Sequence, residues 1–237
     1  MKHRKHVLSN DYLKRQIAFL KQRLESNGLK LTPEQQNQFQ LYIETLVQWN
    51  QRINLISKGD ETKIAQRHFL ESVGLLWLIS FPSDSRILDL GTGAGFPGVP
   101  LKIVRPDLNL LLLDSNRWKT LFLKELVQTL GLNTIEVVWA RAEDNKLKEI
   151  YGQKFDWVIT RAVAALERLW KWSQPFLQEE GSLIAMKGGP IEKEITRLMN
   201  KYPNLQIEEK KYPGSLIEEK VDRKIIWIKI GKEKSER

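Results

Sequence analysis

A glycine-rich turn is the segment of this sequence with the clearest chemical signature. It reads Asp89-Leu-Gly-Thr-Gly-Ala-Gly-Phe-Pro-Gly98 and directly follows a short apolar run. Glycine adopts backbone conformations that other residues avoid and lets a ligand come close to the main chain. In an open parallel sheet, ligands bind at the carboxyl ends of the strands, where such a turn lies. The pattern therefore predicts a small-molecule site at residues 89–98.

Two classes of ligand compete for this turn. The spacing Gly93-x-Gly-x-x-Gly98 satisfies the dinucleotide fingerprint, in which a pyrophosphate binds at the N-terminus of a helix. The run Asp89-x-Gly91-x-Gly-x-Gly95 matches the pattern for S-adenosylmethionine, which carries an ammonium and a sulfonium group but no phosphate. An acid directly before the turn suits those cations and would repel a pyrophosphate. We therefore expect S-adenosylmethionine, with an NAD(P)-dependent oxidoreductase as the alternative.

Further polar residues follow the next two apolar runs. Asp114 ends the second run, and a carboxylate at the tip of that strand can accept hydrogen bonds from both ribose hydroxyls. Its alternative role is to cap a helix together with Ser115 or Asn116. Ala142 and Glu143 follow the third run, where they would meet the edge of an adenine; an acidic first helical turn is the alternative there.

The elements that must position these residues alternate along the chain. Short apolar runs indicate strands at 86–90, 109–113, 134–138, 155–159, 182–186, 205–212 and 224–230. Helical segments are expected around 99–104, 117–130, 143–150 and 166–176. This order is typical of an α/β fold, a doubly wound seven-stranded mostly parallel sheet with helices on both faces. The last two runs flank Pro213-Gly214 as an antiparallel hairpin would.

The segment before the sheet has helical spacing instead. Thr32-Pro33-Glu34-Gln35 predicts a helix start with a capping box, and apolar residues then recur at three- and four-residue steps. A second stripe includes Phe69 and extends to Trp77. We therefore expect two domains, an N-terminal helical cap at 1–82 and the sheet domain at 83–237.

Composition excludes several classes of protein. The 237 residues include no cysteine and three histidines, so neither a disulfide framework nor a usual zinc ligand set is expected, and we predict no metal. The most apolar stretch, 73–81, is much shorter than the ~20 residues of a membrane-spanning helix, so a cytoplasmic protein is expected. A formal net charge of +9 favours a polyanionic partner such as nucleic acid.

Taken together and in order, several segments resemble one known family. They are Trp49-Asn50 with Asn54-Leu55, Arg67–Ser72, Asp89–Gly98, Leu113–Ser115, Arg141–Glu143, Thr160–Ala164 and Met186–Gly188. The set is similar to the bacterial small-subunit ribosomal RNA methyltransferase G family, also called glucose-inhibited division protein B, which methylates a guanine at N7. Glu71, where the family often has Asp, and Thr160, where Ser is common, are mild departures.

The resemblance implies a Rossmann-like methyltransferase that uses S-adenosyl-L-methionine on 16S ribosomal RNA or the small ribosomal subunit. It implies cofactor binding at positions that match Gly91, Phe96, Asp114, Ser115, Asn116, Ala142, Glu143 and Arg161. The turn pattern adds Gly93 and Gly95 to these. The alternative within the same fold is a binding module that holds RNA without catalysis. We expect a monomer.

The implied chemistry requires little from the side chains. Guanine N7 has a lone pair and no proton, so an in-line methyl transfer requires no general base, and we name no catalytic acid or base. Arg161, at the end of the fourth strand, is expected to orient cofactor or guanine; an ordinary ion pair is its alternative. His68 is expected to pack between cap and sheet. Since the major groove of A-form RNA is deep and narrow, the target guanine should lie in an unpaired segment.

Basic residues give a candidate RNA face. Lys2, Arg4 and Lys5 belong to a strongly basic N-terminal stretch. Arg117 and Lys119 follow the second strand, and Lys187 follows the last parallel one. A solvated helix face explains each of these charges about equally well.

Overall fold

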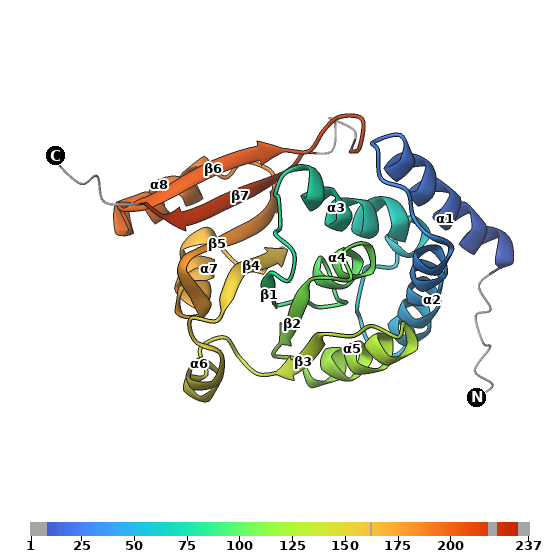
Figure 1. Ribbon diagram of the computed structural model, residues 1–237, viewed down its shortest axis with the longest axis horizontal. Coiled ribbons are helices and arrows are strands. Elements are labelled where there is room, and N and C mark those ends of the chain that lie inside the picture. The colour runs from blue at the N-terminus through green and yellow to red at the C-terminus, as the bar shows by residue number, and fades with distance from the viewer. Residues whose placement is uncertain (1–8, 162, 218–221, 232–237) are drawn as a thin grey trace.

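The structure, a computed structural model, describes residues 9–161, 163–217 and 222–231. Its centre is a seven-stranded sheet with helices on both faces (Figure 1). The strands are β1 (Arg86–Leu90), β2 (Asn109–Asp114), β3 (Ile135–Trp139), β4 (Phe155–Arg161), β5 (Leu177–Gly188), β6 (Leu205–Lys211) and β7 (Arg223–Ile230). Their order is β3-β2-β1-β4-β5-β7-β6, and β7 runs antiparallel to the other six strands. The predicted doubly wound α/β fold is therefore confirmed.

The sheet reverses its winding between β1 and β4. In register, Asp89 of β1 lies beside Leu112 of β2 on one side and Ile159 of β4 on the other. From β1 the chain winds outward to β2 and β3, and then returns to place β4 on the opposite side of β1. The carboxyl ends of β1 and β4 thus form the topological switch point, the usual ligand crevice of such sheets.

The N-terminal helices pack on one face of this sheet. They are α1 (Asn10–Glu25), α2 (Pro33–Asn50), η1 (Glu61–Lys63), the π-helical η2 (Ala65–Phe69), α3 (Leu70–Val73) and η3 (Gly74–Trp77). The capping box predicted at Thr32 and Gln35 is present. One hydrophobic cluster joins Tyr42 and Phe69 of these helices to Leu112 of the sheet. The cap therefore shares its core with the sheet, and the division at residue 82 stays a prediction.

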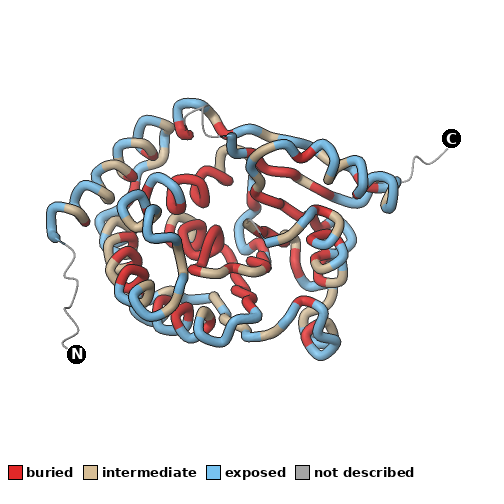
Figure 2. Tube along the Cα trace, turned by 180° about the vertical axis from the view of Figure 1, so that it is seen from behind, coloured by how far each residue is buried: buried red, intermediate tan, exposed pale blue. Residues whose placement is uncertain are grey.

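The remaining helices complete both faces. They are α4 (Gly98–Val104), α5 (Arg117–Thr129), α6 (Asn145–Tyr151), α7 (Leu166–Ser173), η4 (Gln174–Phe176) and α8 (Glu192–Lys201). α4 and α5 share the core with the cap, whereas α6, α7 and α8 pack on a second apolar cluster across the sheet. Figure 2 shows buried segments of the chain gathered in the interior, with exposed segments around them. The sequence did not predict α8, because Leu198 is its one buried residue.

Candidate functional site

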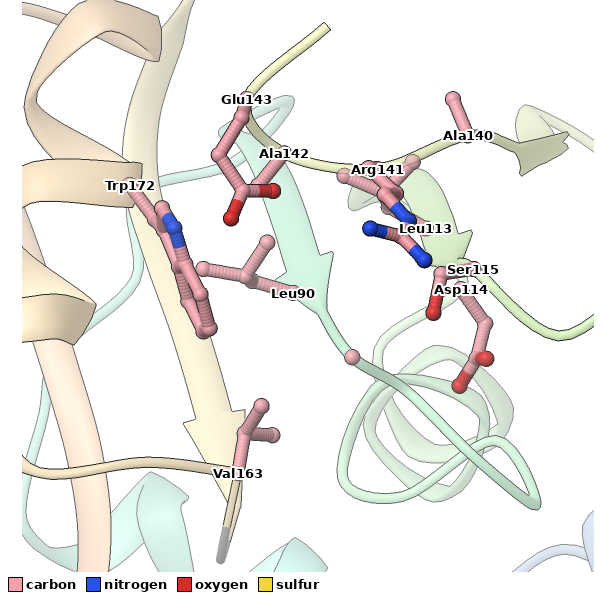
Figure 3. A pocket seen from close by; sticks show the side chains of 11 residues that line it. Leu90, Leu113, Asp114, Ser115, Ala140, Arg141, Ala142, Glu143, Val163 and Trp172 are labelled. Carbon is pink, nitrogen blue, oxygen red and sulfur yellow. The ribbon is translucent and has the colours of Figure 1, made fainter.

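A cavity of about 240 Å³ lies at the carboxyl ends of β1 and β2 (Figure 3). Five predicted cofactor residues line it: Gly91, Asp114, Ser115, Ala142 and Glu143. Figure 3 shows Glu143 on one side with Trp172 of α7, and Asp114 and Ser115 on the other. We refer to it as the first cavity. Trp172 was missed by the sequence analysis, because an aromatic on an amphipathic helix predicts core packing.

The glycines of the turn have different surroundings. Gly93 has a φ of +61°, and a Cβ there would meet only the Gly91 carbonyl oxygen, 3.9 Å away. Gly95 has a φ of +91°, and a Cβ there would lie 2.7 Å from the Tyr42 hydroxyl. Gly93 thus presents open backbone, as a ligand-binding position requires. Gly95, in contrast, permits close packing of the turn against α2.

Asp89 differs from the expectation that it faces a cationic ligand. It is fully buried, and its Oδ2 accepts hydrogen bonds from Thr92 Oγ1 at 2.7 Å and from the Gly98 amide at 2.8 Å. Its Oδ1 has no hydrogen-bond partner. Burial, with a smaller contribution from the nearby Asp114 charge, raises the pKa of Asp89 to about 7. Asp89 therefore closes the turn from beneath, because the turn folds back over the end of β1.

Asp114, unlike Asp89, faces the first cavity. Its Oδ2 accepts from the Gly93 amide at 2.9 Å, and its Oδ1 accepts from the Asn116 amide at 2.8 Å. Each carboxylate oxygen retains another lone pair, so Asp114 can still accept hydrogen bonds from ribose hydroxyls. The helix cap is Asn116, whose side chain accepts from the amides of Trp118 and Lys119. Asn116 does not line the first cavity, and its predicted cofactor role stays a prediction.

The far end of the first cavity is built by the segment after β3. Asp144 caps α6, accepting from the Lys146 amide at 2.9 Å. Ala142 and Glu143 precede this cap and line the cavity, so Glu143 is outside the helical turn considered as its alternative. With Asp114, Glu143 supplies a second carboxylate. Arg141 and apolar walls from Leu90 and Trp172 complete the lining of the cavity. This combination fits a sulfur nucleoside that carries an amino acid.

Arg161 lines a second, larger cavity, and Phe96, which lines neither cavity, packs against it, so the predicted cofactor roles of both stay predictions. The Phe96 ring stacks between Tyr42 and His68, with centroid distances of 5.5 and 4.8 Å. The Arg161 guanidinium lies 5.2 Å from the Phe96 centroid, and its Nη2 is 2.5 Å from His68 Nδ1. Its Nη1 is 3.7 Å from Glu71 Oε2, so the ion pair considered for Arg161 is present. His68 packs between cap and sheet as expected.

The predicted RNA-facing residues divide into three groups. Lys2, Arg4 and Lys5 lie outside the described residues. Arg117 is exposed at the start of α5, 5.7 Å from the ring centroid of the exposed Trp139, and Lys119 follows on the same turn. Lys187 instead pairs with Glu194 at 2.9 Å, and its side chain is 11% exposed. Its charge is thus already compensated within the fold.

Two features are absent from the part of the chain that the structure describes. Within residues 9–161, 163–217 and 222–231, no helix is long and apolar enough to cross a membrane. The same ranges contain no group of three or more His, Asp or Glu side chains arranged to hold a metal ion.

The strand order, with a cavity at the carboxyl ends of β1 and β2, defines a Rossmann-like fold, the class that includes S-adenosylmethionine-dependent methyltransferases. Solved structures with this fold include a SAM-dependent methyltransferase from Aquifex aeolicus, 15% identical over 73% of this chain and 96% of that one, with a TM-score of 0.55. A mutant of MtNAS in complex with S-adenosylmethionine is 12% identical over 94% of this chain and 98% of that one, also with a TM-score of 0.55. These two comparisons establish the shared fold.

Sequence comparison identifies the family. The family described as rRNA small subunit methyltransferase G, or GidB, matches residues 35–226. The ribosomal RNA small subunit methyltransferase G of Desulforamulus reducens is 39% identical over 74% of this chain and 73% of its own length. The protein of the same name from Lachnoclostridium phytofermentans is 37% identical over 90% of this chain and 88% of its own. The chain belongs to this family, which disfavours the NAD(P)-dependent oxidoreductase.

Proposed function

We propose that the chain methylates N7 of a guanine in the 16S RNA of the small ribosomal subunit. The observation that carries this proposal is the family match over residues 35–226, whose relatives are named for small-subunit ribosomal RNA. Two cavities at the carboxyl edge of the sheet support it, because a methyltransferase must hold a cofactor and an acceptor side by side. We further propose that the protein acts as a monomer in the cytoplasm.

The residues of the first cavity would hold the cofactor. Asp114 would accept from the ribose hydroxyls, and Glu143 and the Ala142 backbone would meet the adenine edge. The open backbone of Gly93, in the same turn as the lining residue Gly91, would leave space for the amino-acid end. When bound there, S-adenosylmethionine supplies an activated methyl group on a positively charged sulfur. The protein contributes position and exclusion of water, and correct placement of two reactants can be worth ~7–11 kcal/mol.

The titratable groups near the two cavities agree with a reaction that requires no general base. His68 is buried with Nδ1 directed at Arg161, and burial, followed by the Arg161 charge, lowers the pKa of His68 to about 3. Asp89 is closed beneath the turn by Thr92 and Gly98. An N7 atom with a free lone pair needs neither of them to remove a proton.

The test is methyl transfer to ribosomal material that lacks the modification. The protein is incubated with S-adenosylmethionine carrying a labelled methyl group and with small subunits, or 16S RNA extracted from them, from cells without this enzyme. We expect label in one guanine, located by nuclease digestion and mass spectrometry. RNA with 7-deazaguanine at that position should accept no label, because it lacks N7. Binding of the RNA without transfer would instead support the non-catalytic module.

A further inference from the structure

The second cavity has a volume of about 360 Å³ and lies at the carboxyl ends of β4 and β5. Arg161 contributes from the end of β4, and Met186 to Gly188 contribute from the end of β5. Val163, two residues beyond Arg161, lines the first cavity. The segment at and after the end of β4 therefore contributes to both cavities. A cofactor in the first cavity and an acceptor in the second would each contact this segment.

The cationic side chains of the second cavity become less exposed from its opening to solvent, which we call its mouth, to its interior. Five cationic side chains and two carboxylates line it. Arg67 pairs with Asp60 at 2.6 Å and Arg223 with Glu71 at 3.2 Å, yet their side chains are 55% and 46% exposed, whereas that of Arg161 is 19% exposed. Met186 and Tyr212 are buried and give the cavity less polar walls. Phosphates would thus meet arginines at the mouth, and a planar base would meet Arg161 inside.

The Arg161 guanidinium is held by four neighbours. It lies over the Phe96 ring, its Nη1 approaches Glu71 Oε2 and donates to the Arg67 carbonyl oxygen at 3.4 Å, and its Nη2 contacts His68 Nδ1. Because arginine has donors only, Nδ1 must be the acceptor, which places the histidine proton on Nε2. Phe96 also stacks on the His68 ring at an interplanar angle of 14°. The guanidinium therefore has a fixed orientation before any ligand binds.

We propose that the second cavity binds the acceptor nucleotide, that Arg161 donates to O6 of its guanine, and that His68 is a positioning residue for Arg161. In this arrangement Arg67 and Arg223 pair with the flanking phosphates. Guanine presents the O6 acceptor beside N7, whereas adenine presents an amino donor there. A donor aimed at O6 thus selects guanine and leaves the N7 lone pair free. This inference rests on the proposed function and names the residues that choose its substrate.

The first experiment tests the mouth of the cavity. Arg67→Gln and Arg223→Gln are compared with Arg86→Gln, an exposed arginine at the opposite end of β1. We expect each mouth variant to raise KM for RNA by about tenfold, as removal of one charged hydrogen bond does. We expect kcat, and affinity for S-adenosylhomocysteine by isothermal titration, to stay within about twofold of the control. An unchanged KM for RNA, or a loss of affinity for S-adenosylhomocysteine alone, would overturn the assignment.

The second experiment tests the base contact. RNA with 2-aminopurine at the target position keeps N7 but lacks O6, so the wild-type protein should methylate it with kcat/KM lowered by about tenfold or more. Arg161→Met, which has no hydrogen-bond donor, should methylate both RNAs slowly and at equal rates. An Arg161→Met protein that still prefers guanine would refute the inference and leave the proposed function intact. Absence of transfer from the wild-type protein to any ribosomal RNA would refute the proposed function itself.

The third experiment tests His68. An asparagine carbonyl can take the place of Nδ1, whereas a glutamine amide reaches the place of Nε2, so His68→Asn should keep the preference for guanine and His68→Gln should lose it. Urea unfolding of each variant provides the check on folding. Equal behaviour of the two variants, with both folded, would show that His68 does not position Arg161.

Discussion

Oδ2 of Asp114 accepts a hydrogen bond from the Gly93 amide at 2.9 Å. This bond joins the end of β2 to the centre of the glycine turn after β1. The same carboxylate lines the first cavity, so one side chain both shapes the turn and faces the bound nucleoside. Turn order and cofactor affinity should therefore change together when Asp114 is altered.

Asp114→Ala should weaken binding of S-adenosylhomocysteine by roughly 1–3 kcal/mol, because ribose hydroxyls and the Gly93 amide lose their acceptor. Isothermal titration measures this loss. Asp114→Asn retains one acceptor oxygen and should lose less. If both variants bind as the wild-type protein does, Asp114 does not contact the ligand.

Gly93→Val should lower cofactor affinity by about tenfold or more, because the new side chain occupies the open space over the turn. Gly131→Val is a matched control, since Gly131 has the same φ of +61° and also faces open space. Each substitution should reduce the free energy of unfolding by about 1–2 kcal/mol, the cost of a side chain at positive φ. Only the Gly93 variant should lose affinity in titrations with S-adenosylhomocysteine; equal affinities would contradict the assignment of the turn.

The strands, and the residues at their carboxyl ends that line the first cavity, could be predicted from the sequence because they depend on local patterns. The predicted run 86–90 coincides with β1, since a strand buried in a parallel sheet is apolar throughout. The orientation of Asp89 was not accessible, because it depends on how the turn folds back to place the Gly98 amide on the carboxylate. The contact of His68 with Arg161 joins residues 93 positions apart, which no spacing rule could reveal.

RNA binding should depend on the start of α5. The double variant Arg117→Gln with Lys119→Gln should lower affinity for 16S RNA and flatten its salt dependence, by a slope of about 0.7 for each phosphate of single-stranded RNA that the protein no longer neutralises. Lys124→Gln, an exposed lysine farther along α5, is the control. Filter binding across a salt series measures both slopes. The same slope in both proteins would mean that Arg117 and Lys119 lie on a solvated helix face.

Asp89 should make the stability of the protein depend on pH near neutrality. Its pKa is raised from 3.8 to about 7 in the folded state, so the folded protein binds more protons than the unfolded chain between these values. The raised pKa of Asp89 therefore lowers the free energy of unfolding progressively as pH rises from about 4 to about 7, and no further above that. Asp89→Asn cannot ionise, so its free energy of unfolding relative to wild type should rise by about 2 kcal/mol between pH 5.5 and 8.5. Urea unfolding at both pH values measures this difference, with Asp11→Asn on the exposed surface of α1 as control. A difference that stays constant would show that Asp89 is ionised throughout this range, and one that falls as pH rises would also contradict the raised pKa.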